Sequence, residues 1–296
     1  MTVLTTPKTA VRLAAKGRPL REHLFRLALV ASLVIALGFL ALVLYSMISK
    51  GMGRFDARLW ENMPSIRRPE AAGAQSAITG TMWLIGLTAV MALPTGILAA
   101  IYLEEYADRT RWYNRVIELN IQNLAAIPSI IYGILALGII ARVLGLGFGV
   151  LTGAIALSLL VLPIVIISAR EAIRAVPPSI REGSLALGAT QWQTIYRQVL
   201  PAAIPGIATG SILALSRAIG EAAPLIVLGA ATFVPFNPES LFDRFSALPV
   251  QIYFWITQSR EEFHLLAAAA IVILLALLLL MNSAAILLRN RYQKRY

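Results

Sequence analysis

The sequence contains no cysteine, which excludes disulfide bonds, thiol catalysis and thiolate metal sites. Charged residues make up 14% of its 296 residues, whereas a soluble domain of this size carries about a quarter. Its four lysines all lie outside the G-x-x-x-x-G-K-[ST] pattern of a phosphate-binding loop. We therefore expect no catalytic residue, metal or cofactor. If a nucleotide drives this protein, another chain binds it.

Long apolar runs dominate the sequence instead. Hydrophobic residues make up 58% of the chain, and several runs exceed the roughly 18 apolar residues that signal a membrane span. We predict an all-α membrane protein with six transmembrane helices. The predicted spans are about 24–48, 77–103, 119–143, 147–169, 205–231 and 264–288.

The net charge of +11 gathers partly at the two ends of the chain. An even number of spans places both termini on one side, and basic segments beside spans favour the cytoplasm. Five basic residues between 50 and 68 argue mildly against this topology. We expect no cleaved signal peptide and no nucleic-acid binding. The predicted segments are a basic tail at 1–22, the first span and outer loop at 23–71, a core at 72–289, and a second basic tail at 290–296.

The longest predicted inside loop, at about 177–203, contains signals for two short helices. Two prolines at 177 and 178 end the preceding helix. Ser179 and Glu182 have the spacing of a capping box, so a helix should start there. Gly188 can stop that helix in a left-handed conformation.

The second helix of this loop should be amphipathic. Thr190 and Gln193 form a second capping box, and Pro201 should end the helix. The apolar positions follow helical spacing along one face. This apolar face consists of Trp192, Ile195, Tyr196, Val199 and Leu200. Such a pair of helices either lies in the lipid interface or docks into a groove of a soluble partner.

Arg217 and Glu221 stand four residues apart near the middle of the predicted fifth span. A central arginine costs about 2.5–3.5 kcal/mol on insertion scales, so we expect the two side chains to pair within one helix. Replacing such a pair with apolar residues is often neutral. Ionisable groups inside a membrane instead mark transport paths by default.

The pair also indicates the class of solute. A guanidinium matches a tetrahedral oxyanion with two parallel hydrogen bonds. A neighbouring carboxylate repels a fully ionised anion but can accept a proton from phosphate, which sulfate lacks at neutral pH. Arg217 and Glu221 are therefore our candidate residues for substrate translocation, with phosphate as the candidate substrate.

Several nearby features have simpler interpretations. Gly206, Gly210, Ala214 and Ala218 allow close helix approach, and Pro224 should leave the carbonyl of Gly220 without its helical donor. The glycine-rich stretch 145–149 reads as a tight turn. Two arginines at 170 and 174 read as inside-facing anchors, and the acidic and basic residues between 104 and 115 read as a solvated charge cluster.

Four stretches make the sequence similar to a known family. The pattern E-x-x-x-x-x-G, followed about a dozen residues later by L-P, occurs at Glu182, Gly188, Leu200 and Pro201 and resembles the cytoplasmic loop of ABC-importer permeases. The stretch "SRAIGEAAPL" around Arg217 resembles phosphate-specific permeases of the PstA type, as do "NLAAIPSIIYGILAL" and "ALPVQIY". Ala222 replaces the usual threonine, and Gly183, Ser184 and Gln198 depart from the loop motif. The similarity covers about residues 72–288.

The resemblance implies a type I ABC-importer permease fold with a cytoplasmic coupling-helix loop, which we call the coupling loop (177–203). In that family the loop fits a cleft of an ATPase subunit. The expected site is therefore Glu182, Gly188, Trp192, Tyr196, Leu200 and Pro201 for coupling, and Arg217 and Glu221 for phosphate. The expected partners are a second permease (PstC type), an ATPase dimer (PstB type), an extracytoplasmic phosphate-binding protein (PstS type) and membrane lipid. The expected location is the plasma membrane of a prokaryote.

Three alternatives remain open at this stage. The chain could be a sensor that reports phosphate through the coupling loop without transporting it. The chain could be a permease for another oxyanion, such as sulfate or molybdate. It could also be a membrane-embedded enzyme that acts on phosphate esters, although it has no histidine or paired carboxylates at depth for such chemistry.

Overall fold

The computed structural model describes residues 20–108, 110–229 and 233–292, which form helices without any strand. Most of the two predicted basic tails lies outside these residues. The α-helices are α1 (Leu20–Gly51), α2 (Ala57–Glu61), α3 (Gln75–Ile101), α4 (Trp112–Ala125), α5 (Ser129–Leu135), α6 (Val150–Arg174), α7 (Pro178–Ala186), α8 (Gln191–Thr194), α9 (Leu200–Gly220), α10 (Ala223–Val227), α11 (Leu248–Ile256) and α12 (Glu261–Tyr292). Short 3-10 and π segments are η1 (Met52–Arg54), η2 (Pro69–Ala71), η3 (Tyr102–Tyr106), η4 (Ala136–Val143) and η5 (Ile195–Val199).

The chain divides into two compact units after Ser46. The first unit contains most of α1, an apolar helix long enough to cross a membrane, as predicted for 24–48. The second unit, residues 47–296, contains all the remaining helices.

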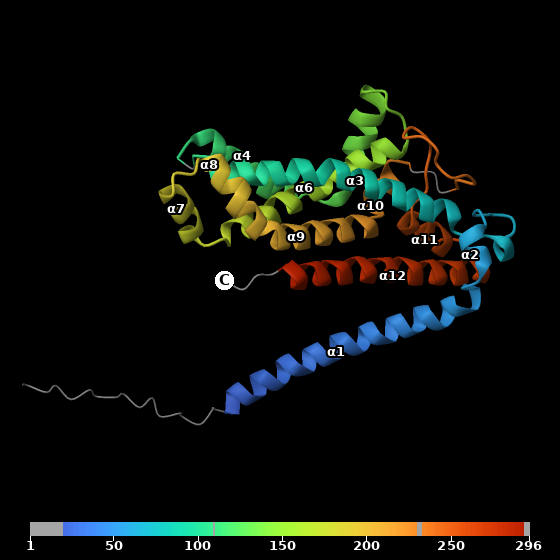
Figure 1. The fold of residues 1–296 in the computed structure, drawn as a ribbon. Helices are drawn as coiled ribbons and strands as arrows, with labels where there is room; N and C mark the ends of the chain where they lie inside the picture. Colours follow the sequence, from blue (N-terminus) through green and yellow to red (C-terminus); the bar gives the residue numbers. More distant parts are fainter. Residues whose placement is uncertain (1–19, 109, 230–232, 293–296) are drawn as a thin grey trace, which may run out of the picture. The chain divides into compact units, whose positions relative to one another are not determined.

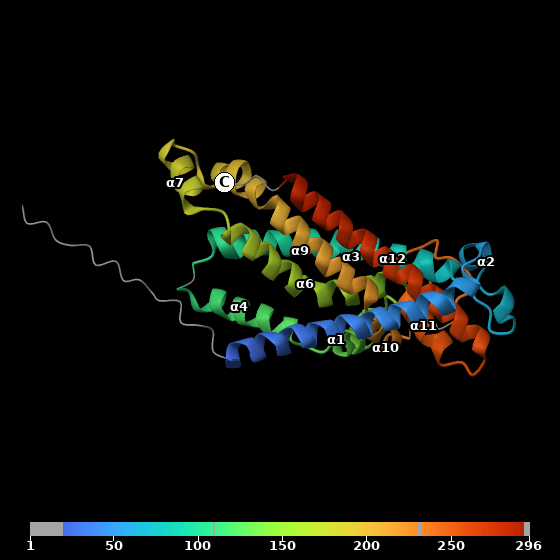
Figure 2. The ribbon, with the colours of Figure 1, turned by 90° about the horizontal axis from the view of Figure 1, so that it is seen from below.

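In the second unit, α3, α6, α9 and α12 run alongside one another (Figure 1, Figure 2). The helices α7 and α8 lie at one end of this bundle, and α2 and α11 lie at the other (Figure 1). The central helix is α6, most of whose residues are buried. A helix that is apolar on all sides is typical of a position inside a bundle.

The predicted third span is sharply bent. The helix α4 and the segment formed by α5 and η4 meet at an angle of 104° around Ala126–Pro128. Pro128 is the N-cap of α5, and proline disfavours a helical conformation in the residue before it. The described residues therefore contain five long apolar helices, or six spans if the bent pair counts as one. The Gly-rich turn at 145–149 forms as predicted, with Gly145 and Gly147 at positive φ.

The predicted fifth span, 205–231, is displaced toward the coupling loop. Its helix runs without a break from Gln191 to Gly220 through α8, η5 and α9. The prediction that Pro201 ends the second loop helix is therefore wrong. Within η5 the amide of Leu200 donates to the carbonyl of Ile195, five residues back. This wider turn relieves the clash that a proline makes with the carbonyl four residues earlier.

The stripe of small residues on α9 lies against α6, as predicted. A β-carbon built on Gly210 would lie 2.5 Å from the Cβ of Ser168, and one built on Gly206 would lie 2.7 Å from the Cβ of Ala172. Ala214 and Ala218 are fully buried in the same contact. The two helix backbones therefore approach closely, which lets dispersion forces hold them together inside the membrane.

We expect Gly210→Ala to lower the thermal unfolding midpoint in detergent, because overpacking a tight contact costs about 1–3 kcal/mol. The matched control is Gly86→Ala on α3, where a β-carbon would meet nothing within 4 Å. This control should unfold at the same or a higher temperature, since alanine favours a helix over glycine by about 1 kcal/mol. Equal midpoints for Gly210→Ala and the original chain would show that α9 and α6 are not tightly packed there.

Candidate functional site

The charged pair lies where α9 ends. The Nε of Arg217 is 3.5 Å from Oε1 of Glu221, so the predicted pair forms. It does not lie within one helix, however, because α9 ends at Gly220 and Glu221 has an extended backbone with φ −81° and ψ 111°. Pro224, which the sequence predicts to leave the carbonyl of Gly220 without its helical donor, lies beyond the end of this helix. It lies in the first turn of α10.

The break in the helix lies at the mid-depth of the bundle. Ala214 and Ala218 pack in one cluster with Val161, which lies near the middle of α6. At 1.5 Å per residue, Val161 is about 17 Å from the first residue of α6 and about 20 Å from the last. Arg217 therefore lies at the end of its helix and level with the middle of α6. Broken helices at this depth are typical of substrate sites in transporters.

The guanidinium lies on the surface of the isolated chain. The Arg217 side chain is 59% exposed, whereas that of Glu221 is 19% exposed. Leu213 and Gly220, one turn to either side of Arg217, are also exposed, while Ala214 and Ala218 are buried. The opposite faces of α9 thus have different roles, one packing on α6 and the other presenting a cation along the membrane-spanning surface.

A hydrogen bond that sequence reasoning missed fixes the rotation of α9. The hydroxyl of Ser216 donates to Oδ1 of Asn282 on α12, with an oxygen–oxygen distance of 3.0 Å. Adjacent residues on an α-helix point about 100° apart. Because Ser216 points at α12, its neighbour Arg217 is directed away from this contact.

Two segments that carry the family resemblance meet beside the pair. A β-carbon on Gly133 of α5 would lie 2.5 Å from the carbonyl oxygen of Pro224 on α10. The hydroxyl of Tyr132 donates to the carbonyl of Leu124 across the bend between α4 and α5 at 2.8 Å. The bent third span therefore supports the segment that follows Glu221.

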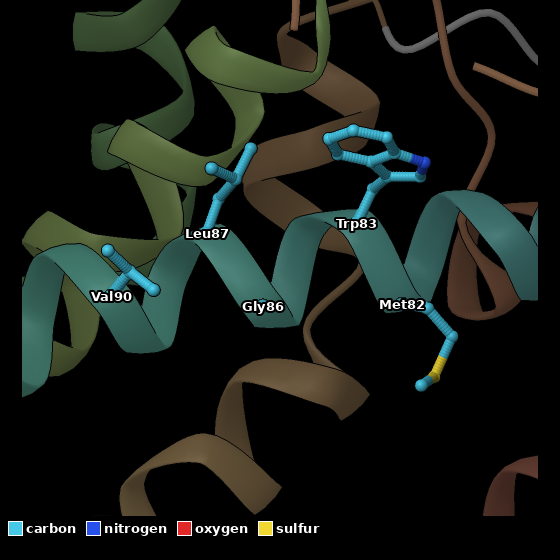
Figure 3. Close-up of a pocket in the computed structure, with 5 residues that line it drawn as sticks. All are labelled: Met82, Trp83, Gly86, Leu87 and Val90. Carbon is cyan, nitrogen blue, oxygen red and sulfur yellow. The ribbon is translucent and has the colours of Figure 1, made fainter. Parts of the chain in front are cut away.

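An apolar hollow of about 420 Å³ on α3 offers no competing oxyanion site (Figure 3). It is lined by Met82, Trp83, Gly86, Leu87 and Val90. None of these side chains carries a charge, so the hollow lacks the cation that an oxyanion needs.

The coupling loop forms a helix pair, with one predicted cap in place and one missing. Thr190 and Gln193 form the predicted capping box, and Gly188 has φ +81° after α7. The predicted box at Ser179 and Glu182 is wrong, because α7 begins at Pro178 with no side-chain cap. Proline at the first helical position already has the required φ, so this helix starts earlier.

The predicted apolar face of the second loop helix splits into two surfaces. Ile195 and Val199 are buried, and Leu200 is half-buried. Trp192 and Tyr196 stack at 5.9 Å between ring centroids and remain 60% and 61% exposed. Two large exposed aromatic side chains in contact are typical of a binding surface.

The remaining coupling residues of the prediction lie on the outside of the same loop. Glu182, Gly188 and Pro201 are exposed. Leu187, on the turn between α7 and α8, is 90% exposed.

The charge cluster after α3 is solvated only in part. Asp108 is exposed, and the amide and hydroxyl of Thr110 donate to it, which lowers the pKa of its carboxyl group below the ordinary value. By contrast, the side chains of Glu104 and Glu105 are 7% and 9% exposed. The prediction of a solvated cluster is therefore wrong for these two residues.

The two acids pair with arginines from other helices. Glu104 contacts Arg170 and Arg174 at the end of α6, and Glu105 contacts Arg181 of α7. The arginines at 170 and 174 are thus ion-pair partners rather than free anchors. Sequence reasoning identified Arg170 and Arg174 but missed Arg181, because no local spacing links 105 to 181.

Comparisons with known proteins agree with this geometry. Residues 92–294 match the model of the family described as binding-protein-dependent transport system inner membrane component. The chain is 36% identical over 230 residues to the phosphate transport system permease protein PstA 1 of Mycobacterium tuberculosis (strain CDC 1551 / Oshkosh), which covers 76% of this chain and 74% of that protein. It is 33% identical over 255 residues to the phosphate transport system permease protein PstA of Yersinia pestis, covering 85% of each.

Solved structures share the fold. A bacterial alginate ABC transporter crystallised with an alginate-bound periplasmic protein superposes with a TM-score of 0.68 at 19% identity, covering 93% of this chain and 96% of that chain. The MetNI methionine ABC transporter superposes with a TM-score of 0.58 at 18% identity, covering 74% of this chain and 97% of that one. The fold is therefore that of an ABC-importer permease, and the chain belongs to the family of binding-protein-dependent transport system inner membrane components.

Proposed function

We propose that this chain is a permease subunit of an ATP-driven importer of inorganic phosphate and that Arg217 and Glu221 line its pathway. The observation that carries the proposal is the exposed guanidinium of Arg217 beside a helix break at mid-depth. The curated relatives reported above are named as phosphate permeases, and they cover most of this chain.

The chemistry of the pair favours phosphate over a fully ionised anion. The guanidinium binds two oxygens of the anion through parallel N–H donors. The carboxylate of Glu221 accepts the P–OH proton, and it holds Arg217 in place at 3.5 Å when the pathway is empty. Sulfate at neutral pH carries no proton that Glu221 could accept, so the carboxylate of Glu221 repels it.

An exposed Arg217 also explains why this chain needs a partner. An arginine facing the acyl chains is costly, so a second permease subunit, of the PstC type, covers this face and completes the pathway. A PstB-type ATPase dimer supplies the energy, and a PstS-type binding protein delivers phosphate on the outer side. All of these are separate chains in our proposal.

The coupling loop is the docking site for the ATPase in this proposal. Its exposed Trp192, Tyr196 and Leu187 supply an apolar surface, and Glu182 adds a charge. The docking end is cytoplasmic because ATP is there. The C-terminal end of α12 lies at this same end of the bundle (Figure 1), which supports a cytoplasmic C-terminus, and basic residues near both termini favour the same side.

We expect Arg217→Gln to abolish phosphate uptake by the reconstituted complex in vesicles, because glutamine cannot bind the anion with two charged donors. The loss should exceed about tenfold, since hydrogen bonds to charged groups contribute about 1.5–3 kcal/mol each. The matched control is Arg142→Gln, an exposed arginine on η4, which should transport normally. Equal uptake by Arg217→Gln and the original chain would remove Arg217 from the pathway.

The Glu221→Gln variant tests anion selectivity. We expect slower phosphate uptake and a smaller preference for phosphate over sulfate, because glutamine neither accepts the proton as a carboxylate does nor repels sulfate. Uptake of radiolabelled phosphate and sulfate measures both effects. An unchanged phosphate rate together with an unchanged selectivity would contradict the role of Glu221.

We expect the double variant Trp192→Ala/Tyr196→Ala to lose the ATPase during co-purification, because it removes the exposed aromatic surface of the coupling loop. Its own unfolding midpoint should stay close to that of the original chain, since both rings are largely exposed. The matched control is Trp112→Ala/Tyr113→Ala, another exposed aromatic pair with ring centroids 6.2 Å apart on α4. Retention of the ATPase by the loop variant would contradict the docking role.

A further inference from the structure

Two consecutive carboxylates at the end of α3 are almost completely buried. Glu104 and Glu105 lie in the π-helical turn η3, and their side chains are 7% and 9% exposed. Burying a carboxylate is costly unless it is paired and hydrogen-bonded. Each acid has its own partners, Glu104 with α6 and Glu105 with the coupling loop. The turn therefore joins a membrane-spanning helix to two different elements.

Arg181 of α7 makes four contacts from one guanidinium. Its Nη2 and Nε lie 2.7 and 3.2 Å from Oε1 of Glu105. Its Nη1 donates to the carbonyl of Val176 at 2.7 Å, and its Nη2 donates to the carbonyl of Ile173 at 2.9 Å. Ile173 lies in the last turn of α6, and Val176 follows that helix directly. Arg181 thus ties α7 to both α3 and α6.

The second helix of the coupling loop reaches the same residue. The side-chain amide of Gln191 donates to the backbone carbonyl of Glu105 at 2.6 Å. The hydroxyls of Ser184 and Thr194 lie 2.9 Å apart and join α7 to α8. Both loop helices therefore contact Glu105, one through its side chain and one through its main chain.

The ion-pair cluster around Glu104 and Glu105 is unsuited to binding an anion. A small cavity beside it is lined by Arg170 and Arg174 but also by Glu118 and Glu171. Both arginines already contact the carboxylate of Glu104. The positive charge at this end of the bundle is thus used to hold helices together.

We infer that Glu105 is the positioning residue through which movement of the coupling loop is transmitted to α3, with Arg181 as its partner. The inference rests on the proposed function, since it assumes that the loop is moved by an ATPase. The residues that transmit the movement are distinct from the exposed ones that dock, such as Trp192 and Tyr196. Loss of the Glu105–Arg181 contact should therefore uncouple ATP hydrolysis from transport without releasing the ATPase.

The first test uses Glu105→Gln in the full complex reconstituted in vesicles. Glutamine keeps the size of the side chain but removes its charge. We expect phosphate uptake per ATP hydrolysed to fall about tenfold, while the ATPase still co-purifies with the chain. The matched control is Glu118→Gln, since Glu118 pairs with Arg170 at 2.9 Å and lies on α4, away from the coupling loop. This control should keep normal coupling.

The outcomes separate this inference from the proposed function. Normal uptake per ATP in Glu105→Gln, with the ATPase bound, would overturn the inference and leave the proposed function intact. Absence of both phosphate uptake and ATPase binding in the original chain would remove the proposed function, and the inference would fall with it.

A second measurement has an arm with Glu105 intact, which does not depend on how well Glu105→Gln folds. Because the chain has no cysteine, spin labels attach within this chain only to Leu98→Cys on α3 and Ala186→Cys on α7, both at exposed positions. We expect the distance between the labels to be the same with and without ATP, because the loop and α3 move together. Adding Glu105→Gln should make this distance change with ATP. A distance that changes with ATP when Glu105 is intact would overturn the inference.

Discussion

The free-energy cost of placing a charge in an apolar environment constrains this structure more than any other effect. The long helices of the second unit are apolar, yet charges remain near the middle of the bundle and at the end that carries α7 and α8. At the centre, Arg217 has one carboxylate nearby and a largely exposed side chain. At the end that carries α7 and α8, Glu104 and Glu105 are buried and held by arginines from two other helices. The paired charges of Glu104 and Glu105 suit a rigid connection between helices. The guanidinium of Arg217, which has a single carboxylate beside it, keeps hydrogen-bond donors that a solute could use.

The helix break at Glu221 lies beside the incompletely paired Arg217. A continuous helix would satisfy its own backbone groups and leave no irregular segment at mid-depth. Here α9 ends at Gly220, and α10 starts two residues after Glu221. The contact between Gly133 and Pro224 supports the irregular segment from the side of the bent third span. The permease thus has a tight contact between α6 and α9 beside a short break in the helix at Glu221.

The features that could be predicted from the sequence are those with a local signal. The long apolar runs, the capping box at Thr190, the turn at Gly188 and the Arg217–Glu221 spacing each depend on residues close in sequence. The end of α9 and the continuation of the helix through Pro201 were missed, because a π turn or tertiary packing decides them. The bend at Ala126–Pro128 was also missed, although Pro128 is a local signal for it. The Glu105–Arg181 contact joins residues 76 positions apart, so no spacing within one helix reveals it.

The two glycine contacts described above differ in what surrounds them. Gly210 faces the side chain of Ser168, so a shorter residue at 168 would make room for a larger one at 210. Gly133 faces the backbone carbonyl and Cα of Pro224, which no substitution on α10 can shorten. A compensating replacement therefore exists for the first contact and not for the second. During evolution a larger residue can arise at position 210 if position 168 becomes smaller. Position 133 must stay glycine for as long as α5 and α10 keep their separation.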